Sequence, residues 1–197
     1  MYPYLSIEER VVMHTNNPTQ GRILHMIDDN RDRFKLTWGS VHNHQAWAGG
    51  WWDHYTDGLN IVCMLYETLS LCRPLPFAIE DAVVAFFAHD IEKPWKYDVA
   101  ADGTLHHKSN FVTKDDANNF RDAKLREYGI ILTPLQANGM EYAEGEIGDK
   151  YSNRNRNASE LAALVHMADH CSARLWHEYP AAENDPWKGA QRIQSQK

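Results

Sequence analysis

Residues 82–88 constrain the fold more than any other part of the chain. These seven residues, AVVAFFA, form the longest uninterrupted apolar run, and His89 and Asp90 follow directly. A helix made of this segment has no polar face, so it belongs in the interior, covered by other elements. An imidazole and a carboxylate at the end of such a buried helix can supply two ligands to one metal ion from a rigid support, provided that other helices bring the remainder.

Apolar residues recur at steps of three and four along most of the remaining chain, which predicts amphipathic helices. In one of them this spacing turns His54 toward the interior, and in another it places Asp169 on a face that is otherwise mostly apolar. The first helix is expected to begin after Ser6, which forms a capping box with Glu9. Further helices are expected over residues 19–29, 51–71, 78–90, 113–129, 133 to 144–148 and 158–179.

Residues 32–50 show no sustained period and are expected to form an ordered loop. No segment alternates convincingly between apolar and polar residues, so the predicted fold class is all-α, a helical bundle with irregular active-site loops. A chain of 197 residues has room for one domain with a substantial core. We expect N-terminal helices in residues 1–40 packed on a main domain in residues 41–180, with a polar tail in residues 181–197.

Composition narrows the classes of function. The net charge of −7 argues modestly against a protein that holds a long polyanion by counterion release. The N-terminus lacks the cationic start and apolar stretch of a signal peptide, and no apolar run is long enough to span a bilayer. These features predict a cytoplasmic protein without a membrane segment, and its three cysteines, with no Cys-x-x-Cys pair, are expected to be reduced.

Four ionisable side chains on inward faces of three predicted helices need a common partner, because unpaired buried charges are costly. They are His54, His89, Asp90 and Asp169. A divalent cation satisfies all four at once, and imidazole nitrogen with carboxylate oxygen suits Mn, Fe, Co, Ni or Zn. The sequence therefore predicts a transition-metal site with these four residues as ligands.

The order of these ligands resembles the H…HD…D signature of HD-domain metal-dependent phosphohydrolases. The surrounding segments are also similar to that family's, and they read HQAWAGGWWDH (44–54), HDIEKP (89–94) and VHMAD (165–169). The resemblance implies an HD-domain-like helical bundle and hydrolysis of a phosphoester or phosphoanhydride bond. Its implied substrate is a small phosphorylated molecule, with a nucleotide as first choice.

The resemblance also implies further roles. Asp90 would bind metal and orient the attacking water. Lys93 would aim a cation at phosphate, with a solvated lysine as the alternative, and His44 would donate a proton to the leaving group, with a residue that packs the loop as the alternative. His107, or its neighbour His106, would hold the substrate or a second ion such as Mg. The chain departs from the family pattern at Glu92, where glycine is commoner, and in lacking a late W-H-x-G-like histidine, which weighs against the di-iron oxygenase branch.

Three alternatives stay open at the level of sequence. The chain could be a 3′–5′ exonuclease on single strands, because residues 44–54 look closest to HD proteins of that kind, or a non-catalytic nucleotide-binding module. His166 and His170, one helical turn apart, could bind a metal on their own. A homo-oligomer is also compatible with the sequence.

Overall fold

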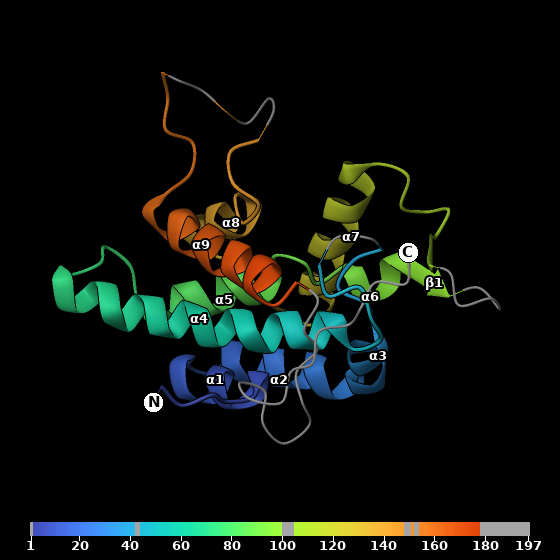
Figure 1. Cartoon of the computed structure of the whole chain (residues 1–197), viewed down its shortest axis with the longest axis horizontal. Helices are drawn as coiled ribbons and strands as arrows, with labels where there is room; N and C mark the ends of the chain where they lie inside the picture. The colour runs from blue at the N-terminus through green and yellow to red at the C-terminus, as the bar shows by residue number, and fades with distance from the viewer. Residues whose placement is uncertain (1, 42–43, 100–104, 148–150, 152–153, 178–197) are drawn as a thin grey trace.

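Helix α4 (Gly50–Cys72) runs through the middle of the molecule (Figure 1), and helices from both before and after it in the chain pack against it. The computed structural model describes residues 2–41, 44–99, 105–147, 151 and 154–177. Its elements are α1 (Ile7–His14), α2 (Thr19–Asp29), α3 (Arg31–Leu36), α4 (Gly50–Cys72), α5 (Ile79–Ala88), α6 (Lys93–Lys96), β1 (Tyr97–Val99), β2 (Leu105–His107), α7 (Lys114–Glu127), α8 (Pro134–Glu141) and α9 (Glu160–Leu175). The mostly helical architecture confirms the predicted fold class.

Helix α5 is the centre of the core. Every residue from 82 to 88 is buried, and α1, α4, α8 and α9 all pack against this helix. In Figure 1, α1, α2 and α3 lie on one side of α4, while α8 and α9 lie on the other. The apolar run is therefore enclosed, as a helix without a polar face requires.

Local sequence signals set the beginnings of four helices, one of which, α9, carries part of the site. The side chains of Ser6, Thr113 and Thr133 each accept a hydrogen bond from the backbone three residues later, and a capping box completes each start. Ser159 caps α9 in the same way, with its side chain accepting from the amide of Ala162. Gly129 follows α7 with a φ of +67°, a conformation that favours glycine at a helix end.

Two predictions about secondary structure were wrong. Residues 31–36, which fall mostly in the expected loop, form helix α3. This helix has one buried side chain, Phe34, whose ring lies 4.6 Å from that of Trp51 and 5.7 Å from that of Trp95. A single anchoring residue gives no period to read, so the packing that forms this short helix cannot be recognised from its sequence.

The second error concerns β structure. Strands β1 and β2 form an antiparallel hairpin in which Tyr97 faces His107 and Val99 faces Leu105. Each strand has three residues, too few to show alternation. The predicted turn at Asp102-Gly103 and the tail from 181 to 197 lie outside the described residues. The last helix is shorter than the predicted 158–179, because α9 ends at Leu175.

Other predicted ends shift by a few residues. Helix α5 ends at Ala88, so His89 is its C-cap and Asp90 comes after the helix. Helix α8 ends at Glu141, earlier than expected. Within the part of the chain that the structure describes, no helix combines the length and the apolar character needed to cross a membrane.

Candidate metal centre and its cavity

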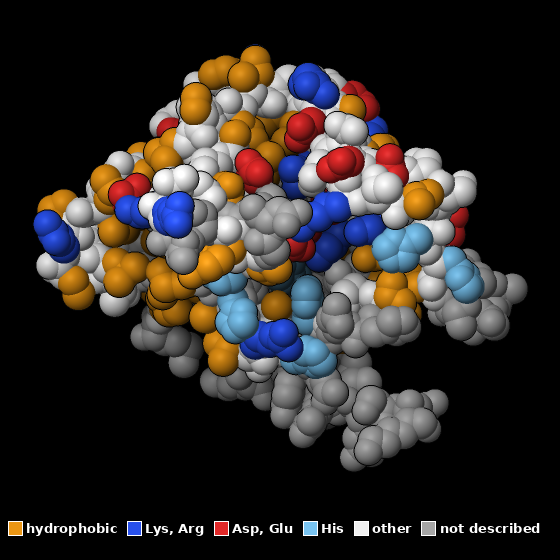
Figure 2. Space-filling model, turned by 90° about the horizontal axis from the view of Figure 1, so that it is seen from above, with side chains coloured by type: hydrophobic (Ala, Val, Ile, Leu, Met, Phe, Trp, Pro, Cys, Tyr) orange, Lys and Arg blue, Asp and Glu red, His pale blue; other side chains and the backbone are white. Residues whose placement is uncertain are grey.

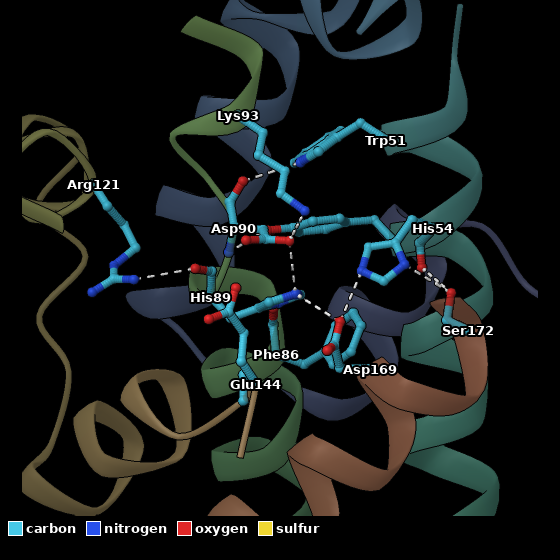
Figure 3. A network of polar contacts seen from close by, with 12 residues as sticks. Trp51, His54, Phe86, His89, Asp90, Lys93, Arg121, Glu144, Asp169 and Ser172 are labelled. Atoms are coloured by element: carbon cyan, nitrogen blue, oxygen red, sulfur yellow. Dashed lines mark hydrogen bonds and ion pairs between the residues drawn. The ribbon is translucent and has the colours of Figure 1, made fainter. Parts of the chain in front are cut away.

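The structure brings the four predicted ligands together from three helices. His54 lies on α4, His89 and Asp90 lie at the end of α5, and Asp169 lies on α9. One potential ligand atom from each residue lies within 4.8 Å of all the others. In Figure 3 the two imidazoles and the two carboxylates converge on one small volume.

The spacing of these atoms fits a shared ion. Oδ1 of Asp169 lies 3.1 Å from Nε2 of His54 and 3.3 Å from Nε2 of His89, which is itself 3.3 Å from Oδ2 of Asp90. Atoms that bind one ion at about 2.1 Å lie about 3.0 to 3.4 Å apart in octahedral or tetrahedral arrangements. Both Nε2 atoms are buried and have no hydrogen-bond partner among the described residues. A cation would satisfy both of them.

The Nδ1 atoms of the two rings already have hydrogen-bond partners, and these partners fix the orientation of each ring. Nδ1 of His89 lies 2.6 Å from the carbonyl oxygen of Phe86, so it carries the proton and donates it. Ser172 donates its hydroxyl proton to the carbonyl of His54 at 3.1 Å and therefore accepts from Nδ1 of the same residue at 3.0 Å. Both rings thus hold a proton on Nδ1 and direct Nε2 toward the shared centre, which is the orientation of metal-binding histidines.

Helix α4 also fixes the backbone of Asp90, which is no longer held by helical hydrogen bonds. The Nε1–H of Trp51 donates to the carbonyl oxygen of Asp90, and the amide of Asp90 donates to the hydroxyl oxygen of Tyr55, both at 3.1 Å. The ring of Tyr55 stacks between those of Trp51 and His89. Trp51 is fully buried, so it serves as a core residue that also positions the site.

Electrostatics within the cluster is set by two buried carboxylates. Burial raises the pKa of Asp90, but the ammonium of Lys93, in direct contact with its Oδ2, and the ring of His89 outweigh that effect and hold the pKa well below its usual range. Asp169 is likewise held ionised, because the two histidines outweigh its burial and lower its pKa. Burial lowers the pKa of His89, but the carboxylates overcome it and raise the pKa to about 10. Burial lowers the pKa of His54, which stays neutral.

A cavity of about 590 Å³ adjoins the cluster, and His89 and Asp90 form part of its wall. Its basic lining residues are Lys93, Lys96, Lys114 and Arg121. Figure 2 shows Lys and Arg side chains gathered where this face of the molecule is hollowed, with acidic side chains along one edge. The volume falls in the range of small-molecule sites. The lining also contains the carboxylates Asp90, Glu92, Asp122, Glu141 and Glu144, so the cations offer sites for an anionic group within a lining of mixed charge.

The predicted auxiliary histidines lie around this centre without joining the cluster. His107 is exposed on β2 and lines the cavity, whereas His106 is exposed and does not line it. The ring of His44 lies 5.3 Å from that of His54, and its buried Nε2 has no hydrogen-bond partner among the described residues. Burial, Lys93 and His54 lower the pKa of His44 to about 3, so this ring is neutral at pH 7 and holds no imidazolium proton to donate.

The other histidine pair is not gathered into a metal site. His166 and His170 lie on α9 with their ring centroids 6.0 Å apart, and Nδ1 of His166 lies 2.8 Å from the carbonyl oxygen of Ala143. Among the described residues, no group of three or more potential ligands includes either of them.

Three contributors to the site were not identified from the sequence. Ser172 could have been found by its spacing, since it lies three residues after Asp169 on the same helix, whereas Tyr55, which directly follows His54, does not share its helix face. Arg121, on α7, donates from Nη1 to the carbonyl oxygen of His89 at 3.3 Å. No sequence signal marks it, because it is one of several basic residues on a polar helix.

Comparisons with models of protein families, with curated proteins and with solved structures find no match for this chain. The assignment of chemistry therefore rests on the geometry of the cluster and its cavity.

Proposed function

We propose that the protein is a metal-dependent phosphohydrolase that cleaves a phosphoester or phosphoanhydride bond of a small phosphorylated molecule, with a nucleotide as the favoured substrate. The observation that carries the proposal is the cluster of His54, His89, Asp90 and Asp169, with two unpartnered Nε2 atoms beside a cavity lined by basic residues. The resemblance of its ligand order to the H…HD…D signature of HD-domain phosphohydrolases supports the same reaction.

The residues divide into two roles. His54, His89, Asp90 and Asp169 would hold a divalent ion such as Mn, Fe, Co, Ni or Zn. Such an ion activates water and stabilises the negative charge that develops on phosphate oxygens. Lys93 remains charged, because its contact with Asp90 outweighs burial and raises its pKa, and it borders the cavity where a phosphate would enter. His107 lines the same cavity and is the residue available to hold a second ion, such as Mg, or the substrate.

The cavity supports a small substrate over a nucleic acid strand. Its volume suits one small molecule, and the apolar side chains of Phe111, Val112 and Met140 line it together with the basic ones. An apolar surface next to a cationic surface matches a molecule with an organic part and a phosphate. A strand would need a basic groove that continues along the surface.

The test combines elemental analysis of the purified protein with a phosphate-release screen over nucleotides and cyclic dinucleotides. Asp169→Asn removes a charged ligand without changing size, so we expect it to lower metal content and to reduce phosphate release by about 100-fold or more. Glu144→Gln is the control for metal content, because Glu144 lines the cavity outside the cluster and pairs with Lys114.

Other outcomes would favour the alternatives. Digestion of a labelled oligonucleotide with metal, without release from nucleotides, would indicate the exonuclease. A protein that binds metal and nucleotides but hydrolyses neither substrate would be a binding module. Equal metal affinity in the parent and in Asp169→Asn would refute the metal site itself.

A further inference from the structure

Arg121 reaches from α7 toward the metal centre from the side opposite His54 (Figure 3). Its side chain is only 12% exposed, and Nη1 donates to the carbonyl oxygen of His89. Because His89 is one of the four clustered residues, this contact holds the guanidinium next to the centre. Arg121 also lines the cavity.

Most of the hydrogen-bonding capacity of this guanidinium is unused. Arginine has five N–H donors, and among the described residues only the one that meets His89 has a hydrogen-bond partner. Nε is buried and has no hydrogen-bond partner among the described residues, and its one ion pair, with Oδ1 of Asp122, is long at 3.7 Å. A largely buried cation with free donors is costly unless a ligand or ordered water satisfies it.

The other basic residues of the cavity are less available. Lys93 contacts Asp90, and Lys114 pairs with Glu144 at 2.6 Å. Lys96 is half-buried and lines the cavity, but it presents a single ammonium. A guanidinium offers two parallel donors to the non-bridging oxygens of a phosphate, which an ammonium cannot.

We propose that Arg121 is the phosphate-binding residue of this cavity, and that its free donors hold the non-bridging oxygens of a phosphate group beside the metal centre. The inference rests on the proposed function for the identity of the substrate, but the binding itself can be tested without turnover. It makes Arg121 the residue that selects phosphorylated molecules over neutral ones of the same size.

The experiment measures the affinity for inorganic phosphate by calorimetry on the metal-loaded full chain, at constant ionic strength. Thermal stability and metal content are recorded for every sample. Arg121→Gln should weaken phosphate binding by about 10-fold or more, because it removes a charge-assisted pair of hydrogen bonds. Arg121→Lys keeps the charge without the planar fork and should be weakened by a smaller factor. Arg126→Gln is the matched control, since Arg126 is exposed on the same helix and does not line the cavity.

The thermal and metal readouts separate phosphate binding from a purely structural role. If Arg121 only supports the carbonyl of His89, Arg121→Gln loses metal or thermal stability, and folded Arg121→Lys binds phosphate like the parent, which would overturn the inference. Unchanged phosphate affinity in Arg121→Gln, or a parent that binds no phosphate, would also overturn it. If Arg121→Gln does not fold, weakened binding by Arg121→Lys with its metal retained supports the inference.

Failure of this inference is distinguishable from failure of the proposed function. A parent that binds phosphate through Arg121 but releases none from any nucleotide would refute the hydrolase and leave the inference standing. If the protein releases phosphate from a nucleotide but binds phosphate equally well in the parent and in Arg121→Gln, the proposed function stands and the inference about Arg121 is refuted.

Discussion

The hydroxyl of Ser172 orients His54, and its removal tests whether this orientation contributes to metal binding. This hydroxyl accepts from Nδ1 of His54 at 3.0 Å and donates to the carbonyl of the same residue at 3.1 Å. Both side chains are fully buried, so water cannot easily replace the hydroxyl. Ser172→Ala removes one oxygen and leaves every ligand atom of the cluster in the chain.

The size of the expected loss of metal affinity follows from where His54 can hold its proton with and without metal. Without metal, the ring in the variant can move its proton to Nε2, which faces Asp169 at 3.1 Å. With metal bound, Nε2 must stay unprotonated, so the proton stays on a buried Nδ1 without a partner. An unsatisfied buried donor costs about 1–3 kcal/mol, and this cost falls on the metal-bound state. We therefore expect Ser172→Ala to lower metal affinity by about 10- to 100-fold.

Metal titration against a competing chelator measures this change. Thr56→Val is the matched control, because Thr56 lies on α4 near His54 and its hydroxyl donates only to the carbonyl oxygen of Trp52. The control should bind metal like the parent. If Ser172→Ala also binds metal like the parent, the hydroxyl of Ser172 does not contribute to metal binding by orienting His54.

Two further predictions concern packing and protons. A Cβ on Gly58 would lie 1.9 Å from Cζ of the buried Phe86, so Gly58→Ala should lower the free energy of unfolding by about 1–3 kcal/mol in denaturant titrations. Gly21→Ala, where the nearest atom lies at 3.4 Å, should be neutral or stabilising, and equal losses in both variants would contradict this reading. Because the pKa of metal-free His89 is raised to about 10, metal must displace its proton, so affinity should rise about tenfold per pH unit between pH 6.5 and 8.5. Calorimetry in buffers of different ionisation enthalpy should show one proton released per ion, and a pH-independent affinity would exclude a protonated His89.

The fold could be predicted where a segment carries its own signal. The capping residues Ser6, Thr113 and Thr133 mark helix starts because their hydrogen bonds are made within four residues. Helix α3 and the β1–β2 hairpin carry no comparable signal. Phe34 is held by Trp51 and Trp95, which are distant in the sequence, and three-residue strands are defined by their partner across the hairpin.

The residues of the site also divide into those that local sequence signals could predict and those that depend on tertiary structure. His54 and Asp169 could be predicted, because helical periodicity shows that an ionisable residue faces the interior and therefore needs a partner. Arg121 could not, because its role depends on the position of α7 relative to the end of α5, which is a tertiary relationship. The neutral state of His44 was equally hidden, since it depends on burial and on Lys93.

The charges of the centre give a reason for combining a metal cluster with a basic cavity. Asp90 and Asp169 contribute two negative charges, and Lys93 compensates one of them. Without metal, the protonated ring of His89 compensates the other, so the metal-free cluster is close to neutral. A divalent ion that displaces the proton of His89 makes the centre positive, and Arg121 adds a second positive charge on the cavity side. The arrangement thus couples the two ligands, because a bound cation strengthens the attraction of the centre for an anion.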